Sequence, residues 1–71
     1  MSTYLVVITD VDSLVERRVN VQAQDALEAH KRAMWEEMTS FETEEITQIQ
    51  DTNKNIVFCR DDGFIEPKGN T

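Results

Sequence analysis

Four side chains of this 71-residue chain could carry out acid–base or nucleophilic chemistry: Asp10, Asp12, His30 and Cys59. The two aspartates stand one residue apart after an apolar run, and carboxylate oxygens are ligands that hard cations prefer. A histidine can act as a base or a pH switch because its ordinary pKa lies near neutrality. A cysteine becomes nucleophilic where an electropositive, accessible setting stabilises the thiolate. Each possibility depends on the neighbours that the fold supplies.

The segment from Val6 to Val15 resembles the first motif of the haloacid-dehalogenase phosphatases, an apolar strand followed by Asp-x-Asp. The resemblance implies that Asp10 is a nucleophile and magnesium ligand and that Asp12 is a general acid and base. The Gly-Thr that follows the second aspartate in that family is absent, and 71 residues are too few for its doubly wound domain. Asp and Ser are favoured in tight turns because their side chains accept backbone hydrogen bonds. We therefore interpret Asp10 to Ser13 as a polar hairpin turn.

His30 falls on the flank of the apolar arc of a predicted helix, with no nucleophile placed near it. We expect a partly buried histidine that is bonded to a strand. Cys59 alternates with Phe58 on a predicted strand and adjoins one base, Arg60, so we interpret it as a small hydrophobic side chain. We predict that the protein is not an enzyme, has no catalytic residues, and uses neither a metal ion nor a cofactor.

Acidic residues outnumber basic ones by fourteen to seven, which gives a formal net charge of −7. This charge repels phosphate backbones and anionic lipids, so we expect no direct nucleic-acid binding and no membrane binding. A basic protein or protein complex fits the field better as a partner. The acids are densest at the end of the predicted helix, in a stretch without a base that contains Glu36, Glu37, Glu42, Glu44 and Glu45.

Trp35 is the aromatic residue that the apolar stripe of the predicted helix does not include. It could cover the edge of a sheet, or it could be an exposed anchor for a partner, because Trp is enriched among interface hot spots. The neighbouring acids could form a docking face, or they could be solvated charge that keeps a small protein soluble. The candidate partner-binding residues are Trp35, Glu36, Glu37, Glu42, Glu44 and Glu45.

The elements that must position these residues start with four predicted strands. Alternation of apolar and polar residues predicts them, and turn-forming residues join them in two hairpins. The first strand is apolar on both faces, which is typical of a central strand that is covered on both sides. The strands span Tyr4 to Thr9, Val15 to Ala23, Glu45 to Gln50 and Asn55 to Arg60.

Between the two hairpins, the apolar period changes from two residues to about 3.6, which predicts one amphipathic helix from about Ala23 to Ser40. Alanines beside the apolar arc would let the helix lie close to a sheet. The arc consists of Leu27, Met34, Met38 and Phe41, and the alanines are Ala26, Ala29 and Ala33.

The third strand contains Ile46 and Ile49, which are three residues apart and cannot share one face of a regular strand. We therefore expect a β-bulge or a late start there. A right-handed connection through the helix would pair the third strand with the first and give the strand order 2-1-3-4.

The predicted fold class is α+β: a β-β-α-β-β chain with a four-stranded, mostly antiparallel sheet and one helix packed on one face. We expect a single domain over residues 1–65 and a flexible C-terminal tail over residues 66–71. One cysteine allows no internal disulfide, and the longest aliphatic run, Leu5 to Ile8, is far too short for a membrane span. We predict a soluble protein in the cytoplasm of a host cell.

The pattern Tyr4-x-Val6-x-Ile8, then Val19-x-Val21-x-Ala23, then a helix with Ala26 and Ala29, resembles small β-β-α-β proteins of phages and mobile elements, including the DpnD/PcfM-like family. In size, acidity and α+β build the chain is also similar to anti-CRISPR proteins. These resemblances imply a phage or mobile-element protein that inhibits a nucleic-acid-handling host complex. The alternative is a structural or oligomerisation module that forms a homodimer through its sheet edge or its helix.

Overall fold

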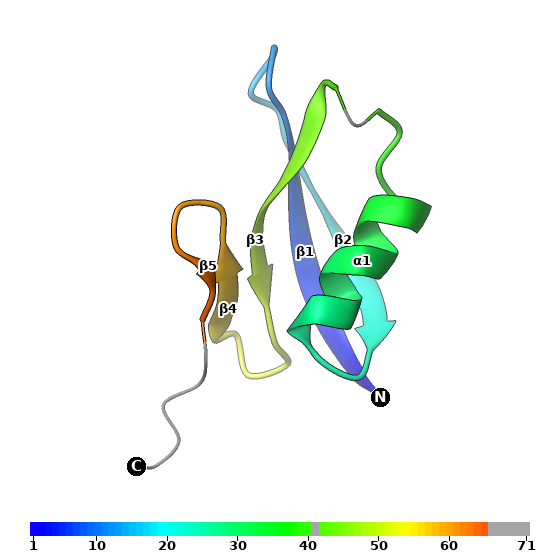
Figure 1. Ribbon diagram of the computed structural model, residues 1–71, viewed down its shortest axis with the longest axis vertical. Helices are drawn as coiled ribbons and strands as arrows, with labels where there is room; N and C mark the ends of the chain where they lie inside the picture. The colour runs from blue at the N-terminus through cyan, green and yellow to red at the C-terminus, as the bar shows by residue number, and fades with distance from the viewer. Residues whose placement is uncertain (41, 66–71) are drawn as a thin grey trace.

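The computed structural model describes residues 1–40 and 42–65, which form one antiparallel sheet with a single helix on one face (Figure 1). The strand order β2-β1-β3-β4-β5 confirms the predicted α+β class and the order 2-1-3-4, with a short fifth strand added at the edge. The predicted C-terminal tail lies outside the described residues. The elements are β1 (Ser2–Asp10), β2 (Glu16–Ala23), α1 (Ala26–Glu36), β3 (Glu44–Gln50), β4 (Ile56–Cys59) and β5 (Gly63–Phe64).

Strand β1 is central because it pairs with β2 on one side and with β3 on the other. Val6 and Ile8 are almost fully buried in the core that faces the helix. Val7 points to the opposite face and is also buried, although α1, the helix of the described chain, covers only one face. The central position of β1 is as predicted, and Val7 shows that this strand is buried on both faces although no helix of the described chain covers the second one.

Helix α1 begins after Asp25, whose carboxylate accepts a hydrogen bond from the backbone N–H of Glu28 at 2.9 Å. Such an N-cap satisfies one of the orphan donors of the first turn. The helix is shorter at both ends than predicted, because Ala23 pairs with Ser2 in the sheet and the last turn carries no basic residue. Acidic residues at a helix C-terminus oppose the helix dipole, so Glu36 and its neighbour Glu37 favour an early end.

The face of α1 that packs on the sheet consists of alanines. Ala29 and Ala33 are fully buried, whereas Leu27 is half-exposed, so the predicted arc is displaced toward the small residues. Met34 and Met38 are partly buried against the core, and Phe41 lies outside the described residues. The short side chains allow a close approach of the helix to the sheet.

A β-bulge in β3 explains how both isoleucines reach the core. Val6 pairs with Ile49 and Ile8 pairs with Ile46, so a step of two residues along β1 corresponds to a step of three residues along β3. The extra residue lets Ile46 and Ile49 face the helix together, and both are buried. The expected bulge is confirmed.

Candidate functional site

Asp10 closes the turn between β1 and β2. Its Oδ1 atom accepts hydrogen bonds from the backbone N–H groups of Asp12 and Ser13, at 2.9 and 3.0 Å. The bond from Ser13 and then that from Asp12 hold the pKa of Asp10 below its usual value. The polar hairpin turn is confirmed, and within residues 1–40 and 42–65 no three His, Cys, Asp or Glu side chains gather as metal ligands would.

His30 packs its ring against two phenylalanines of the last hairpin. Its ring centroid lies 4.9 Å from that of Phe58 and 5.7 Å from that of Phe64, both in edge-on arrangements. Burial lowers the pKa of His30. His30 is partly buried against a strand as expected, but the described contacts are ring contacts where we expected a hydrogen bond.

Cys59 lies next to Phe58 on β4, and neighbouring residues of a strand point to opposite faces of the sheet. Because Phe58 faces His30, the half-buried thiol of Cys59 points away from that histidine. The fold therefore does not bring the thiol and the imidazole together.

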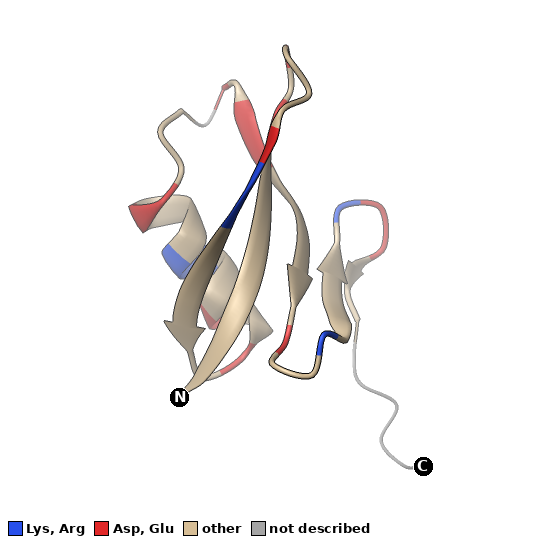
Figure 2. Ribbon diagram, turned by 180° about the vertical axis from the view of Figure 1, so that it is seen from behind, with Lys and Arg blue, Asp and Glu red and all other residues tan. Residues whose placement is uncertain are grey.

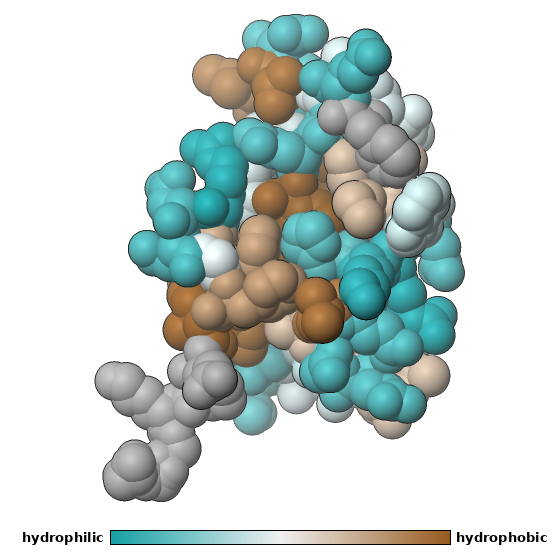
Figure 3. Space-filling model, viewed as in Figure 1, coloured by the Kyte–Doolittle hydropathy of each residue, from teal (hydrophilic) through white to brown (hydrophobic). Residues whose placement is uncertain are grey.

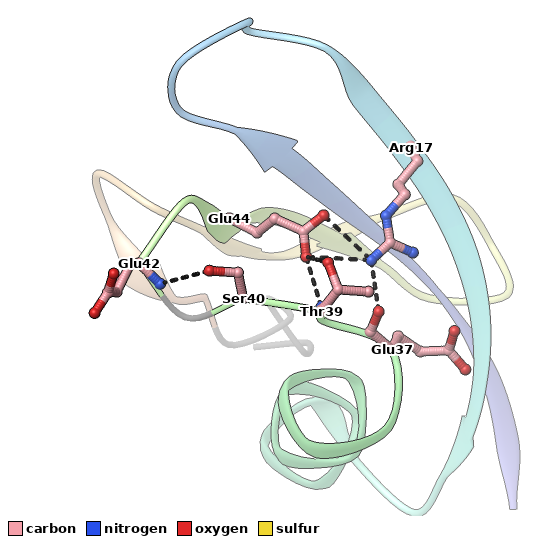
Figure 4. A network of polar contacts seen from close by, with 6 residues as sticks. All are labelled: Arg17, Glu37, Thr39, Ser40, Glu42 and Glu44. Atoms are coloured by element: carbon pink, nitrogen blue, oxygen red, sulfur yellow. Dashed lines mark hydrogen bonds and ion pairs between the residues drawn. The ribbon is translucent and has the colours of Figure 1, made fainter.

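Glu44, one of the predicted partner-binding acids, is drawn into a network between α1 and β3 (Figure 4). Its side chain is only 12% exposed, and its Oε1 atom accepts hydrogen bonds from the backbone N–H of Thr39 at 2.8 Å and from the Thr39 hydroxyl at 3.2 Å. The bond from the Thr39 backbone is the main reason why the pKa of Glu44 is lowered. This carboxylate holds the loop after the helix.

Arg17 completes the same network from β2. Its Nη2 atom lies 3.3 Å from Oε1 of Glu44 and donates a hydrogen bond to the carbonyl oxygen of Glu37 at 2.5 Å. A cation at this position satisfies a carbonyl at the helix C-terminus and favours the dipole. The network thus stabilises the end of α1.

Glu45 and Glu42 lie apart from Glu44. Glu45 pairs with Thr9 in the sheet and forms an ion pair with Arg60, which follows β4. Glu42 is exposed in the loop before β3, where its backbone N–H donates to the Ser40 hydroxyl. The acids of this stretch therefore point in different directions.

Trp35 is 72% exposed on α1. It lines a shallow hollow of about 350 Å³ together with the side chains of Glu28, Lys31, Arg32 and Glu36. Arg32 lies 3.7 Å from Glu28 and 3.9 Å from Glu36, so the charges on this face are mixed. Of the predicted partner-binding set, Trp35, Glu36 and Glu37 lie together at the end of the helix.

An apolar groove of about 570 Å³, which sequence reasoning missed, lies between the start of α1 and the β4–β5 hairpin. Its wall includes Leu27, Phe64 and Ile65, which are 50, 46 and 37% exposed. Asp25 and Asp51 also line it. The signal that could have found it was the Phe64-Ile65 pair, which follows a turn instead of continuing a strand.

A second apolar surface that was missed is the tip of the β1–β2 hairpin. Val11, Leu14 and Val15 are 42, 74 and 63% exposed there, although Val15 was predicted to belong to a strand. The sequence signal was three large apolar residues in a segment otherwise typical of a polar turn. We call these three side chains the hairpin tip.

No protein-family model, curated protein or solved structure matches this chain. No helix of the described chain is both long and apolar enough to cross a bilayer.

Proposed function

We propose that this protein is a non-enzymatic inhibitor that binds a basic, nucleic-acid-handling host protein complex through the C-terminal end of α1. The contact surface consists of Trp35, Glu36 and Glu37, which we call the helix-end surface. The phage or mobile-element origin that the sequence resemblances imply and the cytoplasmic location expected from the single cysteine belong to the same proposal.

The exposure of Trp35 is the observation that carries the proposal. A tryptophan buries 150–250 Å² when it is covered, so leaving it 72% exposed on a small helix forgoes a large hydrophobic gain. Interface hot spots are enriched in Trp because a rigid aromatic side chain supplies much contact area at little entropic cost. A partner that covers Trp35 would recover that gain.

The charge around Trp35 supports a basic partner. Between residues 25 and 45 there are seven acids and two bases, Lys31 and Arg32. Arg32 is engaged by Glu28 and Glu36, and the carbonyl of Glu37 is engaged by Arg17, whose side chain turns inward. Carboxylates bind the same Arg and Lys side chains that hold phosphates, so such a surface can compete with nucleic acid.

The proposal is tested by affinity capture from a host extract at low and at high salt, with two double variants of equal charge change. Glu36→Gln/Glu37→Gln neutralises the helix-end surface, and Asp61→Asn/Asp62→Asn neutralises two exposed acids in the β4–β5 turn. We expect wild-type protein at low salt to capture one nucleic-acid-binding partner. This partner should be lost with Glu36→Gln/Glu37→Gln, with Trp35→Ala and at high salt, and it should be retained with Asp61→Asn/Asp62→Asn. Capture that all variants share equally contradicts the proposal.

The second candidate function is a structural or oligomerisation module that forms a homodimer, and the position of β2 favours it. This eight-residue strand pairs with β1 on one side and forms one edge of the described sheet. An open edge offers a row of backbone donors and acceptors to a second strand. Light scattering at millimolar concentration decides it: a dimer supports the module, and a monomer excludes it.

A further inference from the structure

The hairpin tip has a fixed conformation. The backbone N–H of Asp10 donates to the carbonyl of Val15 at 2.9 Å, and that of Leu14 donates to the carbonyl of Asp10 at 2.8 Å. A third bond, from the N–H of Val11 to the carbonyl of Thr43 at 2.7 Å, ties the turn to the segment before β3. The tip is therefore a hydrogen-bonded projection at one end of a molecule 40 Å long.

Leu14 occupies a backbone conformation that does not suit leucine. Its φ angle is +63°, in the left-handed region where Gly and Asn are strongly preferred. Its side chain is 74% exposed, so packing within the described chain offers little compensation for this strain. Strained backbone of this kind concentrates at functional sites.

The tip is apolar over more than one side chain. Val11 and Val15 flank Leu14, and the space-filling view shows an apolar patch at the end of the hairpin, among hydrophilic neighbours (Figure 3). A protruding apolar cluster of this size fits a concave surface better than a flat one.

Acidic residues surround the tip. Asp12 is exposed within the turn and Glu16 is exposed at the start of β2, and Figure 2 shows further acids at the same end of the sheet, at the start of β3. The nearest bases, Arg17 and Arg18, form ion pairs with Glu44 and Glu16, so these charges offset one another and the excess negative charge at the tip comes from Asp10 and Asp12. The field at the tip is therefore negative.

The negative charge at the tip decides which kind of partner can bind it. A second copy would have to receive the tip in its apolar groove, which Asp25 and Asp51 line, and so would bring carboxylates together. An anionic lipid surface would be repelled for the same reason. A protein with an apolar pocket bordered by Lys and Arg complements both the shape and the charge.

We propose that the hairpin tip is a second docking element, which inserts Leu14 into an apolar, basic-rimmed pocket of a partner protein. The inference takes the class of partner from the proposed function, but it rests on a different surface. The inference predicts that Leu14 contributes to binding and lowers the stability of the folded protein through its left-handed backbone conformation.

The first arm of the test measures stability. Leu14→Asn and Leu14→Gly should fold normally and melt at the same temperature as the wild type or higher, because both residues fit the left-handed region. Leu27→Asn, the same change at a half-exposed helical leucine, serves as the control and should melt lower. A clear loss of stability in both Leu14 variants would show that Leu14 serves the fold and would overturn the inference.

The second arm places the photo-crosslinking residue benzoylphenylalanine at position 14, at position 27 or at position 35 and irradiates host extract at low salt. Position 14 should crosslink to a partner peptide that contains apolar residues and Lys or Arg, and Leu14→Asn should lower recovery of that partner at least tenfold. Absence of a crosslink at position 14, or a crosslink to a second copy of this chain, overturns the inference. Crosslinking at position 35 alone would support the helix-end surface and contradict the hairpin tip as a docking element. Crosslinking at position 14 alone would support the hairpin tip and contradict the helix-end surface.

Discussion

The guanidinium of Arg17 on β2 lies 3.3 Å from the carboxylate of Glu44 at the start of β3, so this ion pair crosses the central strand β1. The same carboxylate accepts the backbone N–H of Thr39, and the same guanidinium donates to the carbonyl of Glu37. Two charged side chains thereby join the end of the helix to both neighbours of β1. Glu44, which the sequence indicated as part of a binding face, instead stabilises the end of the helix beside that face.

Removal of either partner of this pair should destabilise the protein. In Arg17→Met and Glu44→Ala the remaining polar groups lose their partners in a half-buried site, and such losses cost more than an exposed ion pair contributes. We expect the melting temperature to fall on the order of 5 °C in each variant. Glu42→Ala, an exposed acid two residues earlier, should leave it unchanged. Equal melting of all three variants and the wild type would contradict the structural role of the pair.

Acid should destabilise the protein through Glu44 and Asp10. The pKa of each lies below its ordinary value of 4.5 or 3.8, mainly because backbone N–H groups donate to the carboxylates. Their contribution is complete above those ordinary values and is lost as the pH falls through the lower folded-state values. Thermal melts should show a steeper loss of stability below about pH 4 in Glu42→Ala than in Glu44→Ala. Parallel curves would rule out the contribution of Glu44.

His30 should titrate below 6.5, its ordinary pKa, because contact with Phe58 and Phe64 disfavours the charged ring. A lowered folded-state pKa means that its contribution to stability is present above pH 6.5 and decreases as the pH falls through the folded value. The imidazole resonances in an NMR titration report the pKa directly. Replacement of Phe64 by Ala should move it back toward 6.5, and a pKa above 6.5 in the wild type would contradict this packing.

Ala33 should tolerate no larger side chain. It is fully buried where α1 approaches the sheet, so Ala33→Leu would separate the two layers at a cost of about 1–3 kcal/mol in the free energy of unfolding. Lys31→Leu adds an apolar side chain on the exposed surface of the same helix and should change little. Denaturant unfolding compares the two, and a tolerated Leu at position 33 would mean that the helix does not pack through its alanines.

The fold could be predicted from sequence because local patterns determine it. Alternation identified the strands, and the spacing of Ile46 and Ile49 indicated the bulge that lets both reach the core. The helix boundaries were less accurate, because the C-terminal end depends on Arg17, which lies twenty residues before the carbonyl of Glu37 that it satisfies. No local pattern contains that contact.

The candidate site was less predictable than the fold. Helical geometry placed Trp35 off the apolar stripe but left its exposure open. The acids beside it separate in space, since Glu44 turns into the network and Glu45 pairs with Arg60. The hairpin tip was not predicted, because the left-handed conformation of Leu14 depends on the hydrogen bonds of the turn. Side-chain partners across strands decide which charges are available at the surface.

The most direct test of the proposed function is competition between this protein and nucleic acid for the captured partner, measured with the purified partner and a labelled nucleic-acid ligand. We predict that the wild type and Asp61→Asn/Asp62→Asn displace the nucleic acid equally. Trp35→Ala and Glu36→Gln/Glu37→Gln should need at least tenfold higher concentration, although both remain folded. Displacement by all four proteins at the same concentration, or by none of them, would contradict the proposal that the helix-end surface inhibits a nucleic-acid-handling complex.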